Sequence, residues 1–360
     1  MNDINEYLKK EKTKVSQEVN KKIKIYLDTK YWVDICDVTR GVKKNDDINM
    51  IYTFLKNKVK NNEVICPISQ VLFKEVLKQS DEDSLTHTVK IIDELSQGII
   101  ICNQEERFSL ELYNFFYDTL KIEMDKNLKE NFWCKGIAHI FGIQIPYNLN
   151  FTTEINYIIQ QEYFNEIKKY KFLDFIKILG MDKLKLFRDS RVDTNWFDRN
   201  KQDNIHKYKV FNELYMIEIA GSIDFYKNNI EEVFKDVIDN RAKQENIIFH
   251  EKEKFFDIQL ILNMIYNIFK EKKIDLYLPS LDIGAMLHAK IRWNKTQKYK
   301  QGDLDDFRHA ITALPYYDYF FTEKSLHNMI KECKYDKKYN CIVASKNNEI
   351  LDILEKLNLL

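Results

Sequence analysis

KIKIYLDT, residues 22–29, is the stretch that sets the fold of this chain. Ile23, Ile25 and Leu27 alternate with polar positions, and a carboxylate, Asp28, follows them. Alternation with a period of two residues is typical of a half-buried β-strand. The stretch therefore predicts a strand that ends at an acidic side chain, with a helix beginning directly after it.

Four further apolar stretches are predicted to be strands: VICPIS (64–69), GIIIC (98–102), YDYFFT (317–322) and CIVAS (341–345). Helical patterns lie between them, at about 47–61, 70–79, 85–97, 282–293, 303–313 and from 325 onwards, with a final helix to Leu360. Strands that are separated by helical crossovers form parallel sheets. The fold class is therefore predicted to be α/β, with residues 98–102 as the third strand of a parallel sheet.

The domain organisation follows from a change of pattern in the middle of the chain. Residues 1–21 are rich in lysine and glutamate and are predicted to form an exposed N-terminal helix. Residues 22–108 and 279–360 carry the strands, whereas 109–278 contain long apolar-periodic segments such as SLELYNFFYDTL and no evident strand. We expect one α/β domain built from both chain ends, interrupted by an all-helical insert.

Composition excludes several classes of protein. An apolar content of 44% is enough for a buried core and excludes a disordered chain, while 8 glycines and 4 prolines leave few turns and favour helices. The 56 basic and 56 acidic side chains cancel, so nucleic acid is not bound through bulk basicity. Six dispersed cysteines indicate reduced thiols, and neither a signal peptide nor a membrane span is evident, so we expect a cytoplasmic protein.

Acidic residues at the ends of the predicted strands are the candidate site. Asp28 ends the first strand, Glu75 lies in the helix after the second, and Glu323 directly follows YDYFFT. Asp303 and Asp306 share one face at the start of the helix that precedes that strand. Because sites in parallel α/β sheets form at the carboxyl ends of the strands, the topology can bring these acids to one rim.

Each of these acids also has a structural alternative. Asp28 would then cap the helix that follows it, and Glu323 would stabilise the next helix through its dipole. Glu75 would be a solvated helix residue, and Asp303 and Asp306 would mark an ordinary helix start. The case for a site depends on all of them occupying equivalent places in the topology.

These residues resemble the PIN-domain nucleases, which have a short parallel sheet flanked by helices and hold one or two divalent metals with three or four acids. The matching stretches are IYLDT, PISQVLFKEV, DFRHAITA and YFFTEKSL, which carry Asp28, Glu75, Asp306 and Glu323, with Asp303 as an additional or alternative ligand. The resemblance covers about 22–108 and 279–360 and implies a PIN-like fold with a large helical insertion. Two departures are Lys30, where many members have a small polar residue, and a glutamate as the last acid.

What the resemblance implies chemically is metal-dependent hydrolysis of a phosphodiester bond by an activated water. Mg²⁺ or Mn²⁺ prefers oxygen ligands, and a cation relieves the repulsion within a cluster of carboxylates. On this hypothesis Asp28 and Asp306 coordinate directly, with Asp303 and Glu323 as further metal ligands. Glu75 and Glu323 coordinate or orient the attacking water.

A local basic segment is the candidate substrate contact. No acidic residue occurs between Ile283 and Gly302, a segment that also holds Trp293 and Tyr299. Its basic residues are Lys290, Arg292, Lys295, Lys298 and Lys300. Basic and aromatic side chains together suit a single-stranded nucleic acid, although a solvated lysine-rich loop is the alternative. His309 is a candidate phosphate contact or a structural histidine.

Three functions remain open at this point. The leading hypothesis is a PIN-like endoribonuclease, for which the family suggests a role as a toxin or a phage-defence effector. The second is a module without strong catalysis that binds RNA or an inhibitory or activating protein partner through the insert. The third is a structure-specific nuclease acting on DNA, including single-stranded DNA. The oligomeric state stays open.

Overall fold

The computed structural model describes residues 4–122, 131–142, 145–146, 150–180, 182–184, 193–245, 257–271 and 277–357. The chain divides into two compact units. The first contains residues 1–103, 130–190 and 312–360, and the second contains 104–129 and 191–311. Both chain ends therefore belong to one unit, as the strand pattern predicted.

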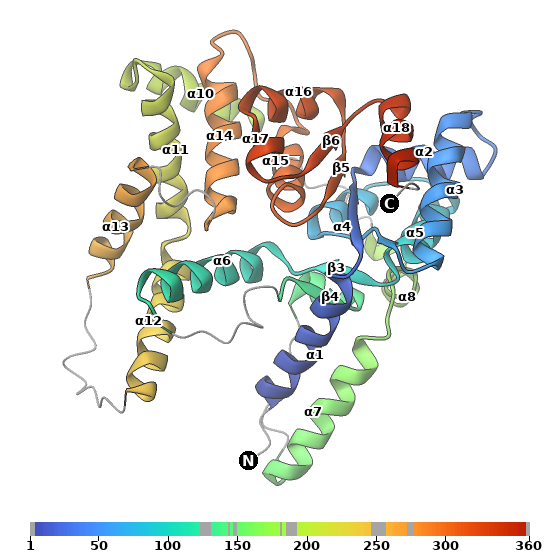
Figure 1. Cartoon of the computed structure of the whole chain (residues 1–360), viewed down its shortest axis with the longest axis horizontal. Helices are drawn as coiled ribbons and strands as arrows, with labels where there is room; N and C mark the ends of the chain where they lie inside the picture. The colour runs from blue at the N-terminus through green and yellow to red at the C-terminus, as the bar shows by residue number, and fades with distance from the viewer. Residues whose placement is uncertain are drawn as a thin grey trace. The chain divides into compact units, whose positions relative to one another are not determined.

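The first unit is built on a four-stranded parallel sheet (Figure 1). Its strands are β1 (Ile23–Leu27), β2 (Val64–Ile65), β5 (Tyr319–Phe321) and β6 (Ile342–Ala344), in the order β2-β1-β5-β6. The register pairs Leu27 with Phe321, and Phe321 with Ala344. The prediction of an α/β fold with a parallel sheet is confirmed, and the carboxyl ends of β1 and β5 lie side by side.

The third predicted strand exists but has a different partner. β3 (Ile99–Ile101) pairs antiparallel with β4 (Trp133–Lys135), and a single parallel bridge joins Ile68 to Ile100. The prediction that 98–102 extends the main sheet was therefore wrong. β2 ends after two residues, so the following chain pairs with β3 outside the main sheet.

The expectation of an all-helical region over 109–278 was also wrong, because β4 lies within it. β4 packs with the N-terminal helix α1 (Ile4–Val19), where the Trp133 amide donates to Ser16 Oγ at 3.3 Å and the Trp133 indole donates to Asn20 Oδ1 at 3.1 Å. The helix expected to be exposed is therefore partly buried.

The remaining helices of the first unit are α2 (Thr29–Thr39), α3 (Asp46–Lys60), α4 (Gln70–Val76), α5 (Glu82–Ser96), α7 (Thr153–Ile167), α8 (Phe172–Leu179), α16 (Lys324–Cys333), α17 (Tyr335–Lys338) and α18 (Asn347–Leu357), with a short 3₁₀ helix η2 (Ile137–Phe141). Helix α3 shows why they form. Its buried residues Ile48, Ile51, Leu55 and Val59 recur every three or four positions, and the Asn45 side chain caps its start. Their apolar faces bury a core shared with Ile25 and Leu27.

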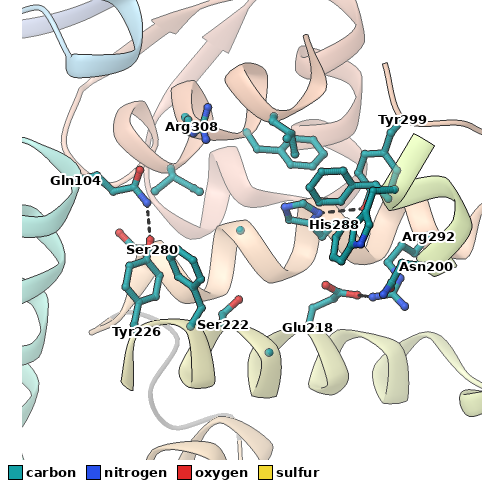
Figure 2. Close-up of a pocket in the computed structure, with 18 residues that line it drawn as sticks. Gln104, Asn200, Glu218, Ser222, Tyr226, Ser280, His288, Arg292, Tyr299 and Arg308 are labelled. Carbon is teal, nitrogen blue, oxygen red and sulfur yellow. Dashed lines mark hydrogen bonds and ion pairs between the residues drawn. The ribbon is translucent and has the colours of Figure 1, made fainter. Parts of the chain in front are cut away.

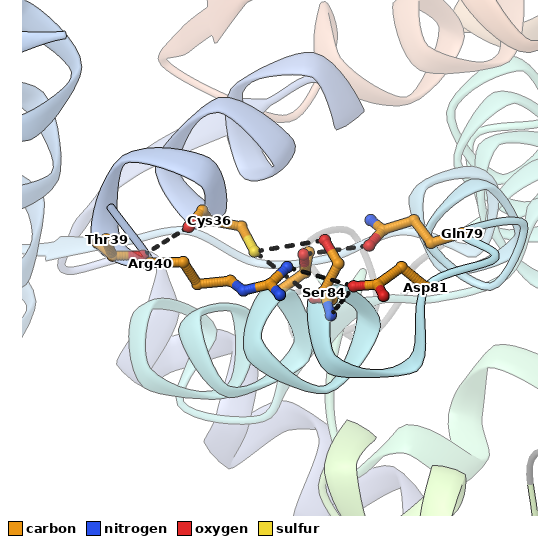
Figure 3. Close-up of polar contacts among 7 residues, drawn as sticks. Cys36, Thr39, Arg40, Gln79, Asp81 and Ser84 are labelled. Carbon is orange, nitrogen blue, oxygen red and sulfur yellow. Dashed lines mark hydrogen bonds and ion pairs between the residues drawn. The ribbon is translucent and has the colours of Figure 1, made fainter. Parts of the chain in front are cut away.

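Polar contacts fix α2, the helix that begins directly after Asp28, against α5 (Figure 3). The Asp81 carboxylate caps α5 by accepting the Ser84 amide at 2.6 Å, and it also accepts from Arg40 at 3.3 Å. The buried thiol of Cys36 donates to the Ser84 carbonyl at 3.5 Å. These contacts hold the C-terminal end of α2, the end away from Asp28, against α5.

The second unit is helical over its described residues. Its helices are α6 (Gln104–Thr119), α10 (Thr194–Asn204), α11 (Phe211–Phe225), α12 (Lys227–Gln244), α13 (Ile258–Lys270), α14 (Pro279–Trp293) and most of α15 (Asp303–Ala313), with a 3₁₀ turn η3 (Ile205–Lys207). Helix α11 packs on α13 and α14, and α6 packs on α12. Buried Glu111 of α6 accepts from the Ser280 amide at 3.1 Å and from its hydroxyl at 2.7 Å, and so caps α14.

The boundaries between the units differ from the predicted ones. Residues 130–190 belong to the first unit, although they were placed in the insert, and 279–311 belong to the helical unit, although they were placed with the α/β half. Helix α14 is buried on nearly all sides, so its sequence has no polar face. The sequence therefore does not show which of the two units the helix packs in.

The turn after α14 is organised by one buried ammonium group. Lys201 of α10 is 4% exposed, and its Nζ donates to the carbonyls of Ile291, Asn294 and Gln297 at 2.9, 2.5 and 2.6 Å. Three carbonyl acceptors match the three donors of a lysine side chain. The turn in the basic segment is therefore stabilised by hydrogen bonds to Lys201 and is not simply a solvated loop.

The described part of the chain has two further properties that bear on its chemistry. No disulfide is present among the described residues, and burial raises the pKa of the Cys66 thiol. No described helix combines the length and the apolar character that crossing a membrane would require.

Candidate functional site

Asp28 stands at the carboxyl end of β1, at the N-cap position of α2, but its side chain makes no capping hydrogen bond. Its Oδ2 instead accepts from the hydroxyl of Thr322 at 2.6 Å. The residue is 5% exposed. The pairing of β1 with β5 places Thr322 beside Asp28. The carboxylate is therefore held across the sheet, and the alternative of a simple helix cap does not describe it.

Glu75 reaches the same place from α4, whose first turn is capped by the Ser69 hydroxyl. The side chain is half-buried, and Thr29, the residue after Asp28, donates its hydroxyl to Glu75 Oε2. One carboxylate oxygen of Asp28 and one of Glu75 lie within 4.8 Å of each other. Glu75 is therefore not a solvated helix residue, and two of the predicted acids are brought together.

Two carboxylates this close repel each other when both are ionised. Burial adds to the free-energy cost, because a charge with little solvent depends on partners for compensation. Thr322 and Thr29 each supply one neutral donor, which orients the carboxylates but adds no positive charge. An arrangement of this kind is suited to a divalent cation.

Tyr31 of α2 is affected by the negative charges around Asp28 and Glu75. Its side chain is fully buried, and its hydroxyl has no hydrogen-bond partner among the described residues. Burial raises the pKa of Tyr31 well above its usual value, and the charges of Asp28, Asp34, Glu349 and Glu323 raise it further. Glu323 and Asp28 therefore act on the same phenol, and Glu349 is an acid that the sequence motifs did not indicate.

Glu323 follows β5 and occupies the N-cap position of α16, where its side chain makes no capping hydrogen bond. The residue is exposed. Its neighbour Thr322 is fully buried and carries the contact to Asp28. Thr322 and Thr29 were not predicted as site residues, because a threonine at a strand end or a helix start is ordinary. Each is next to a predicted acid, and Thr322 is the threonine that ends the strand in the matching stretch YFFTEKSL.

Helix α15 carries the remaining candidates of the acid set. Asp303 accepts the Lys300 amide at 2.8 Å, which is the helix-start role given as its alternative, and burial raises its pKa. Asp306 is half-buried one turn later. His309 follows after three more residues and is 1% exposed.

The predicted substrate contacts fall into two classes. Lys295, Lys298 and Lys300 are exposed in the segment between α14 and α15, beside Trp293, which is 42% exposed. Arg292 is different, because its side chain is 12% exposed and forms an ion pair with Glu218.

Two other members of the basic segment are engaged with neighbouring side chains. The Nζ of Lys290 lies 5.7 Å from the ring centroid of Phe211. Tyr299 is buried, and its hydroxyl lies 3.0 Å from His288 Nδ1. The surface available to a nucleic acid in this segment is therefore formed by the three exposed lysines and Trp293.

Lys30, the first departure from the family pattern, is engaged next to the site. Its Nζ lies 2.7 Å from Asp34 Oδ2 and 4.6 Å from the ring centroid of Tyr31. The positive charge is thus paired with an acid of the same helix.

Comparison of the chain with protein-family models, with curated proteins and with solved structures gave no match. The functional argument therefore depends on the residues themselves.

Proposed function

We propose that the chain is a metal-dependent PIN-like nuclease that cleaves RNA. One observation carries the proposal: the buried carboxylate of Asp28 is fixed by Thr322 with an oxygen within 4.8 Å of one from Glu75. Two acids from separate stretches meet at the carboxyl end of a parallel sheet, where α/β enzymes place their sites. The same two acids open the PIN-like motif series.

The donor set fits Mg²⁺ or Mn²⁺. Both ions prefer carboxylate oxygens, and neither thiols nor a histidine cluster is needed. Asp28 and Glu75 would hold the cation, which supplies activation of water and stabilisation of charge on the scissile phosphate.

Helix α15 and the end of β5 are proposed to complete the ligand set. Asp306, or alternatively Asp303, would add a carboxylate, and Glu323 would add the last acid. His309 is a further ligand candidate, since it is a buried imidazole three residues after Asp306. A nitrogen ligand would favour Mn²⁺ over Mg²⁺, because imidazole suits the softer ion.

The reaction would be an in-line hydrolysis. Water attacks phosphorus, the bond from phosphorus to the 3′ oxygen breaks, and that oxygen takes up a proton, leaving a 5′-phosphate and a 3′-hydroxyl. Glu75 would accept a hydrogen bond from the attacking water, with its carboxylate oriented by the Thr29 hydroxyl. Asp28 keeps its position because Thr322 holds it across the sheet.

A single-stranded nucleic acid is favoured as substrate by the exposed lysines of the 294–302 segment and the exposed ring of Trp293. The choice of RNA over DNA follows the PIN-like resemblance. Backbone phosphates suit the lysines, and an unpaired base can stack on the indole. The chain has no bulk positive charge with which to hold a duplex.

The test is cleavage of labelled single-stranded RNA, structured RNA and single-stranded DNA by the full chain with Mg²⁺, with Mn²⁺ and with EDTA. We expect metal-dependent cutting of single-stranded RNA, with products that a 5′-phosphate-dependent exonuclease degrades. Cutting of DNA alone would contradict the RNA assignment. Cutting that persists in EDTA would contradict the metal mechanism.

A valine at position 322 tests how Asp28 is held. Thr322→Val keeps the side-chain volume but removes the hydroxyl that donates to Asp28. We expect Mn²⁺ affinity, measured by calorimetry, to fall by about 10-fold to 100-fold, as for other residues that orient metal ligands. Thr39→Val is the matched control, because the Thr39 hydroxyl donates to a helix carbonyl of the same unit. Equal affinities in the two variants would exclude the positioning role.

A further inference from the structure

The helical unit contains a cavity of about 520 Å³, which lies within the size range of small-ligand sites. Helices α11, α14 and α15 supply most of its wall (Figure 2). Helix α14 presents Ser280, Gly284, His288 and Arg292 at a spacing of four residues, so they share one face, and α11 faces it with Glu218 and Ser222. Arg308 enters from α15.

Aromatic rings dominate the apolar part of this cavity. Phe197 and Tyr299 are 5.2 Å apart between ring centroids, and Tyr226 lines the opposite end. Trp196 and Phe225 line the cavity as well, yet they are 55% and 79% exposed. Exposed apolar side chains gathered beside a cavity are one mark of a ligand-binding groove.

The cavity has a positive charge balance. Its charged lining residues are Glu218, Arg292 and Arg308, that is, one negative and two positive side chains. Glu218 is paired with Arg292, while Arg308 is half-exposed and pairs with Asp305, which does not line the cavity. Burial lowers the pKa of His288 to about 4, and the charges of both arginines lower it further, so the imidazole is neutral at physiological pH.

Polar groups lie at both ends of the cavity. At one end, the Arg292 guanidinium pairs with the Glu218 carboxylate. At the other end, Gln104 donates to the Tyr226 hydroxyl, and Ser222 adds a second hydroxyl to the lining. Donors and acceptors at both ends of an aromatic cavity match the edges of a nucleobase.

We propose that this cavity binds a nucleotide unit, with the base between the aromatic rings and the phosphate at Arg308. Base stacking on aromatic side chains and charge-assisted hydrogen bonds from arginine to phosphate are the two interactions that the lining supplies. The unit can be a free mononucleotide or one nucleotide of a single-stranded RNA. The proposal concerns binding and does not depend on the nuclease activity.

Gly221 offers a way to close the cavity without disturbing the fold. It lines the cavity from α11, and a Cβ added there meets no heavy atom within 4 Å. Leucine has a much better helix propensity than glycine, so Gly221→Leu should not weaken the helix. We expect the variant to melt at the same temperature as the wild type or higher, and to lose ligand binding.

The experiment is calorimetric titration of the full chain, in EDTA, with the four ribonucleoside 5′-monophosphates, the four nucleosides, and hexauridylate and hexaadenylate. We expect at least one phosphorylated ligand to bind with a Kd below about 1 mM and its nucleoside to bind at least tenfold more weakly. Binding of a monophosphate identifies a free nucleotide as sufficient. Binding of a hexanucleotide alone identifies the nucleotide unit as part of an RNA chain.

Variants make the assignment specific. Arg308→Gln is expected to weaken the binding of the phosphorylated ligand at least about tenfold and to leave the binding of the nucleoside unchanged. Arg199→Gln, at an exposed ion pair of α10 outside the lining, is the matched control and should bind as the wild type does. The proposal is overturned if no phosphorylated ligand binds the wild type, or if Gly221→Leu binds with unchanged affinity. Because cleavage is not measured, failure here leaves the nuclease proposal to its own test.

Discussion

Asp28→Asn is expected to lower the rate of metal-dependent RNA cleavage by at least about 10³-fold, since the loss of metal activation removes several kcal/mol of transition-state stabilisation. Asparagine keeps an oxygen that can accept from Thr322, so the contact across the sheet can remain. It removes one of two negative charges whose oxygens lie within 4.8 Å. The measurement is the single-turnover rate on labelled RNA.

Stability separates this effect from unfolding. Without a cation, Asp28→Asn relieves the repulsion with Glu75, so the variant should melt at the wild-type temperature or higher. Adding Mn²⁺ should raise the melting temperature of the wild type only, because the ion stabilises the state that binds it. Asp37→Asn is the control on the same helix, where the carboxylate is already paired with Lys43 at 2.6 Å. A destabilised Asp28→Asn protein would mean that the carboxylate has a structural role.

Lys201→Met is expected to lower the free energy of unfolding of the helical unit by about 3 kcal/mol, because hydrogen bonds to a charged group contribute about 1.5–3 kcal/mol each and are only partly replaced by water. The substitution leaves the carbonyls of Ile291, Asn294 and Gln297 without their shared donor. Water can reach the exposed part of this turn, so the loss should be smaller than the sum of three bonds.

Thermal unfolding and amide exchange over 294–300 are the readouts. We expect a lower melting temperature and faster exchange in this segment for Lys201→Met. Lys207→Met, which replaces an exposed lysine in the turn after α10, is the control and should behave as the wild type does. Equal stability of the two variants would mean that the ammonium group does not organise the turn.

Local elements were the part of the fold that the sequence could predict. The period of two residues marked β1, and the helix predicted over 303–313 matches α15 residue for residue. The pairing of the strands was harder to predict, because the sequence pattern of a strand does not show which strand lies beside it. β3 was predicted as a strand, but it pairs with β4 rather than with the main sheet. β4 itself was missed, although it is as long as β3, β5 and β6.

The part of the site that could be predicted was the set of acidic residues that follow strands in the chain. Asp28 and Glu75 were singled out by their place after strands, and the structure brings their oxygens together. The hydroxyls that hold them belong to Thr322 and Thr29, whose contacts depend on side-chain geometry that no motif records. The Lys201 contacts were equally hidden, because they join residues about ninety positions apart and use backbone carbonyls.

The central claim is that Asp28 and Glu75 hold a divalent cation, and the most direct measurement is titration of Mn²⁺ into the protein with detection of free Mn²⁺ by electron paramagnetic resonance. We predict that the wild-type chain removes free Mn²⁺ signal until its site is filled, and that Asp28→Asn and Glu75→Gln leave the signal as it is in buffer. A wild-type chain that leaves the free Mn²⁺ signal unchanged, or variants that bind as the wild type does, would contradict the account.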